Sequence, residues 1–299
     1  MTLLELVNSC AKQLDDAHLS FGHGTQNAFD EAAWLVLWRL GLPLDSALDT
    51  AGDCADKPLS DEDVEQVYAL VRERIQTRQP AAYLTHEAWL EGFAFYVDAR
   101  VIVPRSLIAE LLVHGGMDYF LSPSTHKVLD LCTGNGSLAI IAAQVFPDIE
   151  ITGADLSEDA LAVARINVEK YQLQERLVLL QSDGLQAPAL QARGPFDLMV
   201  CNPPYVNANS MAELPPEYLA EPTMALDGNT AGGSDGMDFV RSLLQNAAAQ
   251  LSPHGVLVLE IGNERPYFEA AFPLLEVVWL ETSAGEDQVC LITHAALTS

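Results

Sequence analysis

After residue 126, the sequence alternates regularly between two kinds of segment. Segments rich in Val, Ile and Leu predict seven strands, at 128–132, 150–154, 177–181, 197–201, 256–261, 276–280 and 289–293. Segments with apolar residues at helical spacing predict helices at 137–145, 158–171, 238–251 and 265–272. This alternation predicts an α/β fold with a mainly parallel sheet covered on both faces. Because only a turn near 283–287 separates the last two strands, we expect an antiparallel hairpin at one sheet edge.

The first 80 residues have a different pattern, in which helical spacing dominates. Apolar residues predict helices over 3–14 and 29–40, and the second of these contains Trp34 and Trp38. Ser60, followed by acidic and then apolar residues, predicts a third helix with a side-chain cap. Together these segments predict a small helical bundle with the aromatic residues in its core.

Residues 88–103 are rich in aromatic and β-branched residues with a period near two, broken at 98–100. This pattern predicts a β-hairpin that links the bundle to the sheet. We therefore expect three parts, a helical bundle, a hairpin linker and an α/β domain, at 1–82, 83–105 and 106–299.

The net charge of the chain restricts its partners. There are 42 Asp and Glu against 15 Lys and Arg, which gives a formal charge of −27. A nucleic-acid backbone is bound through clustered Lys and Arg, so tight unassisted binding to DNA or RNA is not expected. The acidity favours a cationic partner, and solubility or salt tolerance is the alternative interpretation.

The cysteines and the apolar runs indicate the compartment. The five cysteines are widely spaced, at Cys10, Cys54, Cys132, Cys201 and Cys290. They form no Cys-x-x-Cys or Cys/His cluster, so neither a zinc site nor a disulfide framework is predicted. The N-terminus carries an acid at Glu5 and has no apolar run typical of a signal peptide. No stretch approaches the length of a transmembrane helix. We expect a cytoplasmic protein without a membrane partner.

The sequence VLDLCTGNG at 128–136 is a predicted strand that runs into a glycine loop and then a helix. Glycine lets the backbone approach a ligand closely, and the N–H groups at a helix start can bind an acidic group. Only Gly134 and Gly136 are present, so the dinucleotide fingerprint G-x-G-x-x-G is not met. A ligand-binding loop is favoured, and a structural turn is the alternative.

Acidic residues follow the next two predicted strands. Asp155, which lies 25 residues after Asp130, is placed to accept hydrogen bonds from ribose hydroxyls. Its alternative role is to cap the helix that begins near Glu158. Asp183, within Ser-Asp-Gly at 182–184, can accept from an exocyclic adenine amine, and an ordinary Asp-Gly turn is the alternative.

The most specific motif is Asn202-Pro203-Pro204-Tyr205, directly after the predicted strand 197–201. The two prolines remove two N–H donors and fix φ, so the segment is rigid and offers carbonyl acceptors. Asn202 has both an acceptor oxygen and donor N–H groups, and Tyr205 adds a flat face and a hydroxyl. The motif is therefore suited to a planar, neutral group that carries an NH2.

At these residues the sequence resembles the class I, Rossmann-like methyltransferases that use S-adenosylmethionine, in the amino-methylating group marked by [DN]-P-P-[YFW]. More narrowly, it resembles the HemK/PrmB family of protein glutamine N5-methyltransferases over about 78–294, through segments 78–84, 93–97, 103–111, 221–226 and 235–238.

Two departures from the release-factor branch of that family favour its other branch. The release-factor branch usually has Pro-Arg-Pro in the linker and glycine at the position of Cys132, whereas this chain has Pro104-Arg105-Ser106. Both features, with Gly262-Asn263, resemble the branch whose substrate is a glutamine of the third large-subunit ribosomal protein, uL3. The loop 228–234 is longer than the family's usual connection, which leaves its geometry near the substrate site open.

The resemblance implies S-adenosylmethionine as cofactor, no metal, a methyltransferase domain at 106–299 and substrate recognition by the bundle. It implies that the cofactor is bound by Asp130, Cys132, Thr133, Gly134, Asn135, Gly136, Asp155, Leu156, Asp183, Gly184 and Asn202. Catalysis and substrate binding are implied for Asn202, Pro203, Pro204 and Tyr205. Arg105 either orders the linker or contacts substrate.

Three other functions stay open at this point. A release factor is the alternative protein substrate for the same chemistry. A DNA or RNA amino-methyltransferase shares the Asn-Pro-Pro-Tyr signal, but it must extrude or capture an unpaired base and usually has a basic surface. A ribosome-assembly factor that binds without catalysis is the non-enzymatic alternative. The sequence leaves the oligomeric state and the target glutamine open.

Overall fold

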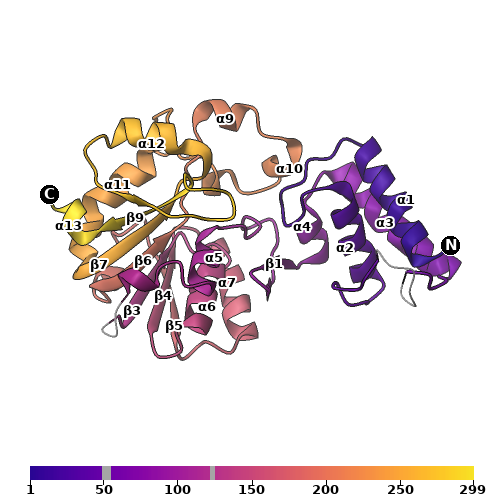
Figure 1. Cartoon of the computed structure of the whole chain (residues 1–299), viewed down its shortest axis with the longest axis horizontal. Helices are drawn as coiled ribbons and strands as arrows, with labels where there is room; N and C mark the ends of the chain where they lie inside the picture. Colours follow the sequence, from indigo (N-terminus) through magenta and orange to yellow (C-terminus); the bar gives the residue numbers. More distant parts are fainter. Residues whose placement is uncertain (49–54, 122–124) are drawn as a thin grey trace. The chain divides into compact units, whose positions relative to one another are not determined.

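The computed structural model describes residues 1–48, 55–121 and 125–299, so Cys54 lies outside the described residues (Figure 1). The chain forms two compact units. The helical unit comprises Met1–Ala88 together with Leu214–Ala220, and the α/β unit comprises Trp89–Glu213 together with Glu221–Ser299. No pattern in the sequence indicates that the short stretch Leu214–Ala220 groups with the N-terminal helices.

The helical unit is built from α1 (Leu3–Asp16), α2 (Ala28–Arg39), α3 (Asp61–Thr77), α4 (Ala81–Thr85) and α10 (Pro216–Leu219). The side chain of Ser60 accepts a hydrogen bond from the N–H of Asp63, which confirms the predicted cap of the third helix. Apolar residues of α1, α2 and α3 form a single core. The first two predicted helices are also confirmed, within two residues at each end.

The α/β unit contains a seven-stranded sheet with the order β5-β4-β3-β6-β7-β9-β8. Its strands are β3 (Lys127–Leu131), β4 (Glu150–Asp155), β5 (Leu177–Gln181), β6 (Phe196–Cys201), β7 (Leu251–Glu260), β8 (Val278–Trp279) and β9 (Val289–Thr293). The first five strands of this order pair in parallel, and β9 pairs antiparallel with both β7 and β8. The predicted seven-stranded α/β fold with an antiparallel edge hairpin is confirmed.

Side chains that alternate along each strand enter separate cores on the two faces of the sheet. In β3, Val128 belongs to one core and Leu129 to the other, and Leu198 and Met199 of β6 divide in the same way. Helices α5 (Ile108–Val113), α6 (Ser137–Val145) and α7 (Glu158–Lys170) contribute to the first core. Helices α11 (Asp238–Ala247), α12 (Arg265–Ala271) and α13 (His294–Leu297) contribute to the second (Figure 1).

The remaining elements are short helices on the connections of the α/β unit. They are α8 (Pro188–Gln191), α9 (Ala208–Ala212) and the 3-10 turns η1 (Asp118–Phe120), η2 (Thr223–Ala225), η3 (Ala248–Gln250) and η4 (Gly262–Glu264). No helix in the described part of the chain is long and apolar enough to cross a membrane.

The hairpin prediction is correct in kind but wrong in extent. Strands β1 (Ala88–Leu90) and β2 (Phe93–Phe95) are joined by Glu91 and Gly92, both with positive φ, as in tight two-residue hairpins. The predicted strand residues up to 103 are irregular. There, the Asp98 carboxylate accepts hydrogen bonds from the backbone and the side chain of Arg100, which closes a local turn.

Two other predicted boundaries are wrong. The helix predicted over 238–251 ends at Ala247, and Leu251 already belongs to β7, where it pairs with Phe196. Strand β7 thus begins five residues before the strand predicted over 256–261. The strand predicted over 276–280 contains only Val278 and Trp279. In both places tertiary pairing, rather than local apolar spacing, decides where the element begins and ends.

Candidate active site

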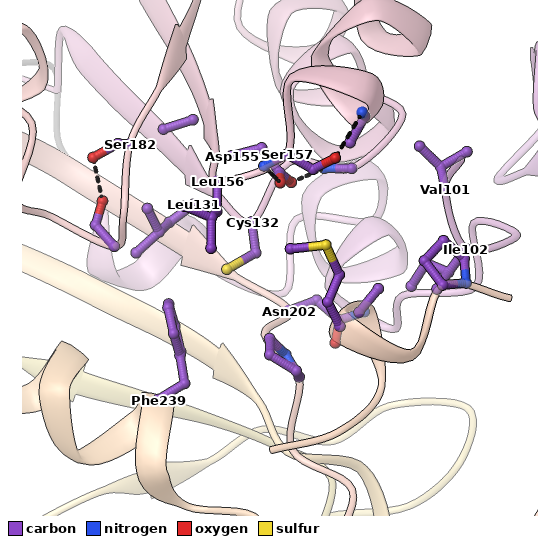
Figure 2. Close-up of a pocket in the computed structure, with 18 of the residues that line it drawn as sticks. Val101, Ile102, Leu131, Cys132, Asp155, Leu156, Ser157, Ser182, Asn202 and Phe239 are labelled. Atoms are coloured by element: carbon purple, nitrogen blue, oxygen red, sulfur yellow. Dashed lines mark hydrogen bonds between the residues drawn. The ribbon is translucent and has the colours of Figure 1, made fainter. Parts of the chain in front are cut away.

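An open cavity of about 190 Å³ lies at the carboxyl ends of the parallel strands (Figure 2). The strand order reverses between β3 and β6, and ligands of open α/β sheets bind outside the carboxyl ends of strands at such a point. The last residues of these strands, Leu131 and Cys201, are register partners. The glycine loop and the Asn-Pro-Pro-Tyr loop therefore begin side by side.

Asp130, near the end of β3, holds the glycine loop in place through hydrogen bonds. The buried carboxylate of Asp130 accepts hydrogen bonds from the Thr133 hydroxyl at 2.5 Å and from the Ala139 N–H at 3.0 Å. Burial raises its pKa to about 7. Asp130 and Thr133 do not line the cavity, so they shape the loop and leave Gly134 at its surface.

The two glycines of this loop have different surroundings. Both have positive φ, +54° at Gly134 and +84° at Gly136. A side chain at Gly136 would meet Ala164 of α7 at 3.3 Å, so this glycine permits close helix packing. A side chain at Gly134 would project into open space, and this glycine lines the cavity. The neighbouring Asn135 is buried and does not line it.

Cys132 is the first residue of this loop, and its sulfur points into the cavity (Figure 2). Its φ of +61° is unusual for a residue with a side chain and costs about 1–2 kcal/mol, a cost that glycine would avoid. A hydrogen bond with Cys201, together with burial, raises the pKa of the Cys132 thiol well above its ordinary value. The thiol is therefore protonated and weakly nucleophilic at neutral pH.

Asp155 ends β4 and faces the cavity, as does the next residue, Leu156. Its carboxylate oxygens accept hydrogen bonds from the N–H groups of Gly134 and Ser157, both at 2.9 Å. Burial raises its pKa despite these bonds. The N-cap of α7 is Ser157, whose hydroxyl accepts from the Ala160 N–H, so the alternative role of Asp155 as the helix cap is wrong.

Asp183 and Gly184 follow β5 and line the same cavity. Gly184 has a φ of +52°, and the Ser182 hydroxyl donates to its carbonyl at 2.6 Å, so these residues do form a turn. The turn and a ligand role are therefore compatible. Phe239 of α11 lies across the cavity (Figure 2). It was not predicted as a site residue, because its helix is distant in sequence from the loops that follow the strands.

Asn202 and Pro204 line the cavity, whereas Pro203 and Tyr205 do not. The Tyr205 ring lies against Gly262, where an added Cβ would come within 2.8 Å of the ring. A φ of +52° also favours glycine at position 262. Gly262 thus provides the space in which the tyrosine of the motif is seated.

The chain that follows the motif is held by a buried pair, Asn207 and Glu264, that was not predicted from the sequence. The Asn207 side chain caps α9 and donates to both carboxylate oxygens of Glu264 at 2.8 Å. Asn207 and Glu264 are both buried. An Asn immediately before a helix was the only local signal, since its partner is 57 residues away.

Two segments, 100–102 and 222–225, form the opposite wall of the cavity. Thr230 also lines this cavity. Thr230 belongs to the long loop 228–234, whose geometry the sequence left open. That loop packs on the chain after the motif, because the Ser234 carbonyl accepts from the Ala208 N–H and Asp227 bridges to Val206.

Arg105 is absent from the cavity lining and is paired with Glu221. Its guanidinium donates two parallel hydrogen bonds to the Glu221 carboxylate, at 2.7 and 2.8 Å. Of the residues implied to bind cofactor or substrate, the cavity brings together Cys132, Gly134, Asp155, Leu156, Asp183, Gly184, Asn202 and Pro204. It does not include Asp130, Thr133, Asn135, Gly136, Pro203, Tyr205 and Arg105.

Within residues 1–48, 55–121 and 125–299, no group of three or more His, Cys, Asp or Glu side chains is arranged to hold a metal ion.

Known proteins with similar sequences are methyltransferases. Residues 111–226 match the family model described as "Methyltransferase small domain". The chain is 51% identical to "Ribosomal protein uL3 glutamine methyltransferase" of Burkholderia pseudomallei, over 99% of this chain and 95% of that protein. It is 48% identical to the protein of the same name from Bordetella pertussis, over 100% of this chain and 97% of that protein.

Among solved structures, the chain resembles the hMettl16 catalytic domain in complex with MAT2A 3'UTR hairpin 6. The TM-score is 0.50 at 12% sequence identity, and the alignment covers 78% of this chain and 81% of that chain. At this identity the resemblance concerns the fold alone. The predicted class I methyltransferase fold and the predicted family are both confirmed. Identity near one half over almost the full length of both chains shows that this chain belongs to the family of ribosomal protein uL3 glutamine methyltransferases.

Proposed function

We propose that this chain transfers a methyl group from S-adenosylmethionine to the side-chain amide nitrogen of a glutamine in ribosomal protein uL3. The observation that carries the proposal is that Asn202 and Pro204 share one cavity with Gly134, Asp155 and Asp183. The names of the full-length relatives support the choice of uL3 as substrate.

The lining of the cavity fits this cofactor chemically. Asp155 and Asp183 offer carboxylate oxygens to ribose hydroxyls and to an adenine amine, respectively, and Gly134 lets the backbone approach the ligand. Leu156 and Phe239 offer apolar surface to a flat heterocycle. When bound, S-adenosylmethionine supplies a methyl group on a cationic sulfur. The acidic lining favours that charge.

Asn202 has the central chemical role in this proposal. The nitrogen of a primary amide is a poor nucleophile, because its lone pair is delocalised into the carbonyl. Acceptors of this loop, chiefly the side-chain oxygen of Asn202, which lines the cavity, take hydrogen bonds from the substrate NH2 and raise the electron density on nitrogen. These bonds strengthen as positive charge develops, so they stabilise the transition state more than the ground state.

The rigid loop also orients the substrate. Pro203 and Pro204 fix the backbone, and Tyr205 is seated against Gly262, so the acceptors of the loop have a defined direction. Holding the amide in line with the reacting bond contributes several kcal/mol and up to about 7–11 kcal/mol in favourable cases. No strong base is needed, because methyl transfer to the NH2 nitrogen breaks the sulfur–methyl bond and first gives a cationic, N-protonated N-methyl amide. This cation is very acidic and loses its proton to water or to a carbonyl.

The helical unit is proposed to recognise the protein substrate, and the acidic surface is proposed to attract it. Ribosomal proteins are strongly basic before assembly, and the net charge of −27 is spread over the whole sequence. Turnover efficiency on uL3 should therefore fall as salt rises. A flat salt profile would assign the acidity to solubility or salt adaptation.

The test uses the purified full-length chain with S-adenosylmethionine and, in separate reactions, purified uL3 and a purified release factor. Tandem mass spectrometry should locate one added methyl group on a glutamine of uL3, with none on the release factor. The Asn202→Ala variant serves as the matched control. Methylation of the release factor alone would refute the substrate assignment, and cofactor binding without methylation of either protein would favour a binding role.

A further inference from the structure

Glu221 joins the two irregular segments that form one wall of the cavity. Its side chain is fully buried, and its Oε1 accepts a hydrogen bond from the Val103 N–H at 2.8 Å. Segment 100–102, which lines the cavity, immediately precedes Val103, and segment 222–225 immediately follows Glu221. The hydrogen bond thus connects two stretches that lie 118 residues apart in sequence.

Arg105 completes this connection. It donates to Glu221 through both terminal nitrogens, and one of them also donates to the Val103 carbonyl at 3.1 Å. The two residues after Arg105 are bound to the sheet, because the Ser106 hydroxyl and the Leu107 N–H donate to Glu260 at the end of β7. The wall is therefore anchored to a rigid strand through Arg105.

The wall has little regular structure of its own. Residues 102–106 form neither helix nor strand, and 223–225 form a single 3-10 turn. Without a continuous backbone ladder, the position of such segments depends on side-chain bonds. A buried carboxylate also requires its cationic partner, so removal of either residue of the pair leaves a buried group uncompensated.

We propose that Arg105 and Glu221 are positioning residues that set the shape of the cofactor cavity without contacting the reacting atoms. The inference rests on the proposed function only in the identity of the cofactor. It predicts that the pair controls cofactor affinity and that methyl transfer at saturating cofactor is largely preserved.

Glu217 provides a matched control four residues away. It is also a buried glutamate paired with arginines, at 2.8 Å from Nε of Arg78 and 3.7 Å from Nη1 of Arg74. However, Glu217 belongs to the helical unit and does not line the cavity. Glu217→Gln therefore removes a buried, paired charge without touching the cavity wall.

The experiment measures the dissociation constant of S-adenosylhomocysteine by calorimetry for the full-length wild type, Glu221→Gln, Arg105→Gln, the double variant and Glu217→Gln. Glu221→Gln should raise the constant about tenfold, the scale of one charge-assisted hydrogen bond. The dissociation constant of the double variant should not exceed that of the weaker-binding single variant, because each single change already removes the same Arg105–Glu221 interaction. Glu217→Gln should retain the wild-type constant.

Thermal unfolding and methyl transfer to uL3 at saturating cofactor are measured in parallel. An unchanged dissociation constant in folded Glu221→Gln would overturn the inference. An equal loss of affinity for S-adenosylhomocysteine in Glu217→Gln would also overturn it. So would a loss of affinity in the double variant equal to the sum of the two single losses. If the wild type binds the cofactor product but does not methylate uL3, the proposed function fails while the binding comparison still decides the role of the pair.

Discussion

Replacement of Gly262 by alanine tests how the motif tyrosine is held. The backbone at Gly262 has a φ of +52°, and an added Cβ would lie 2.8 Å from Cε2, 2.9 Å from the hydroxyl oxygen and 3.0 Å from Cζ of Tyr205. The left-handed backbone costs about 1–2 kcal/mol for any L-residue. Ordinary contact begins near 3.4 Å, so the ring must move by about 0.6 Å (3.4 minus 2.8). Because Tyr205 continues the Asn-Pro-Pro segment, this movement shifts the proposed amide-binding groups.

Gly92 serves as a control that separates the cost of the left-handed backbone from the cost of the contact with the Tyr205 ring. It also has a positive φ, of +78°, but an added Cβ there would meet nothing within 4 Å. Gly92→Ala should therefore lose only about 1–2 kcal/mol of the free energy of unfolding. Gly262→Ala should lose about 1–2 kcal/mol more and reduce methyl transfer by at least about tenfold, since a shift of 1 Å at a reacting site can cost about 10².

The assays are urea unfolding followed by fluorescence and initial rates of methyl transfer to uL3. Tyr205→Ala removes the ring, so Gly262→Ala should be less destabilising in that background than in the wild type. If Gly262→Ala costs the same free energy of unfolding in both backgrounds, or no more than Gly92→Ala, the proposed seating of Tyr205 is refuted.

Three further predictions concern single groups of the site. Asn202→Ala should reduce kcat by about 10²–10³ with little change in cofactor affinity, and turnover near that of the wild type would contradict its role. Asp155→Ala should mainly raise the cofactor dissociation constant, and an unchanged calorimetric value would exclude the ribose contact. Burial raises the pKa of Glu260 from 4.5 to about 7, so the folded state binds the proton more tightly than the unfolded state. Its contribution to stability is therefore fully present below about pH 4.5 and is lost as pH rises to about 7. Glu260→Gln should lose less unfolding free energy than the wild type between about pH 4.5 and pH 7.

Much of the candidate site could be predicted because it lies where strands end. The glycine loop follows β3, Asp155 ends β4, Asp183 follows β5 and Asn202 follows β6. The carboxyl ends of parallel strands meet at one edge of a sheet, so the order of the segments was enough to bring these residues together. Local chemistry, namely glycine spacing and two consecutive prolines, then indicated which loops line the cavity.

The opposite wall could not be predicted in the same way. Segments 100–102 and 222–225 have no periodic pattern, and their separation in sequence hides the Glu221 hydrogen bonds that join them. The residues after Phe95 alternate as a strand would, but local hydrogen bonds of Asp98 close a turn instead. Alternation along the sequence is compatible with more than one local structure, and contacts made on folding select between them.

Periodicity and strand-end chemistry are local properties, so the sequence predicts the class of fold, the order of the strands along the chain and most of the loops that line the cavity. Roles that depend on distant partners are set by the tertiary structure. It paired Arg105 with Glu221, seated Tyr205 against Gly262 and grouped Leu214–Ala220 with the N-terminal helices. The physical reason is that a buried charge or a close approach exists only once the chain has folded, since both require atoms that are far apart along the sequence.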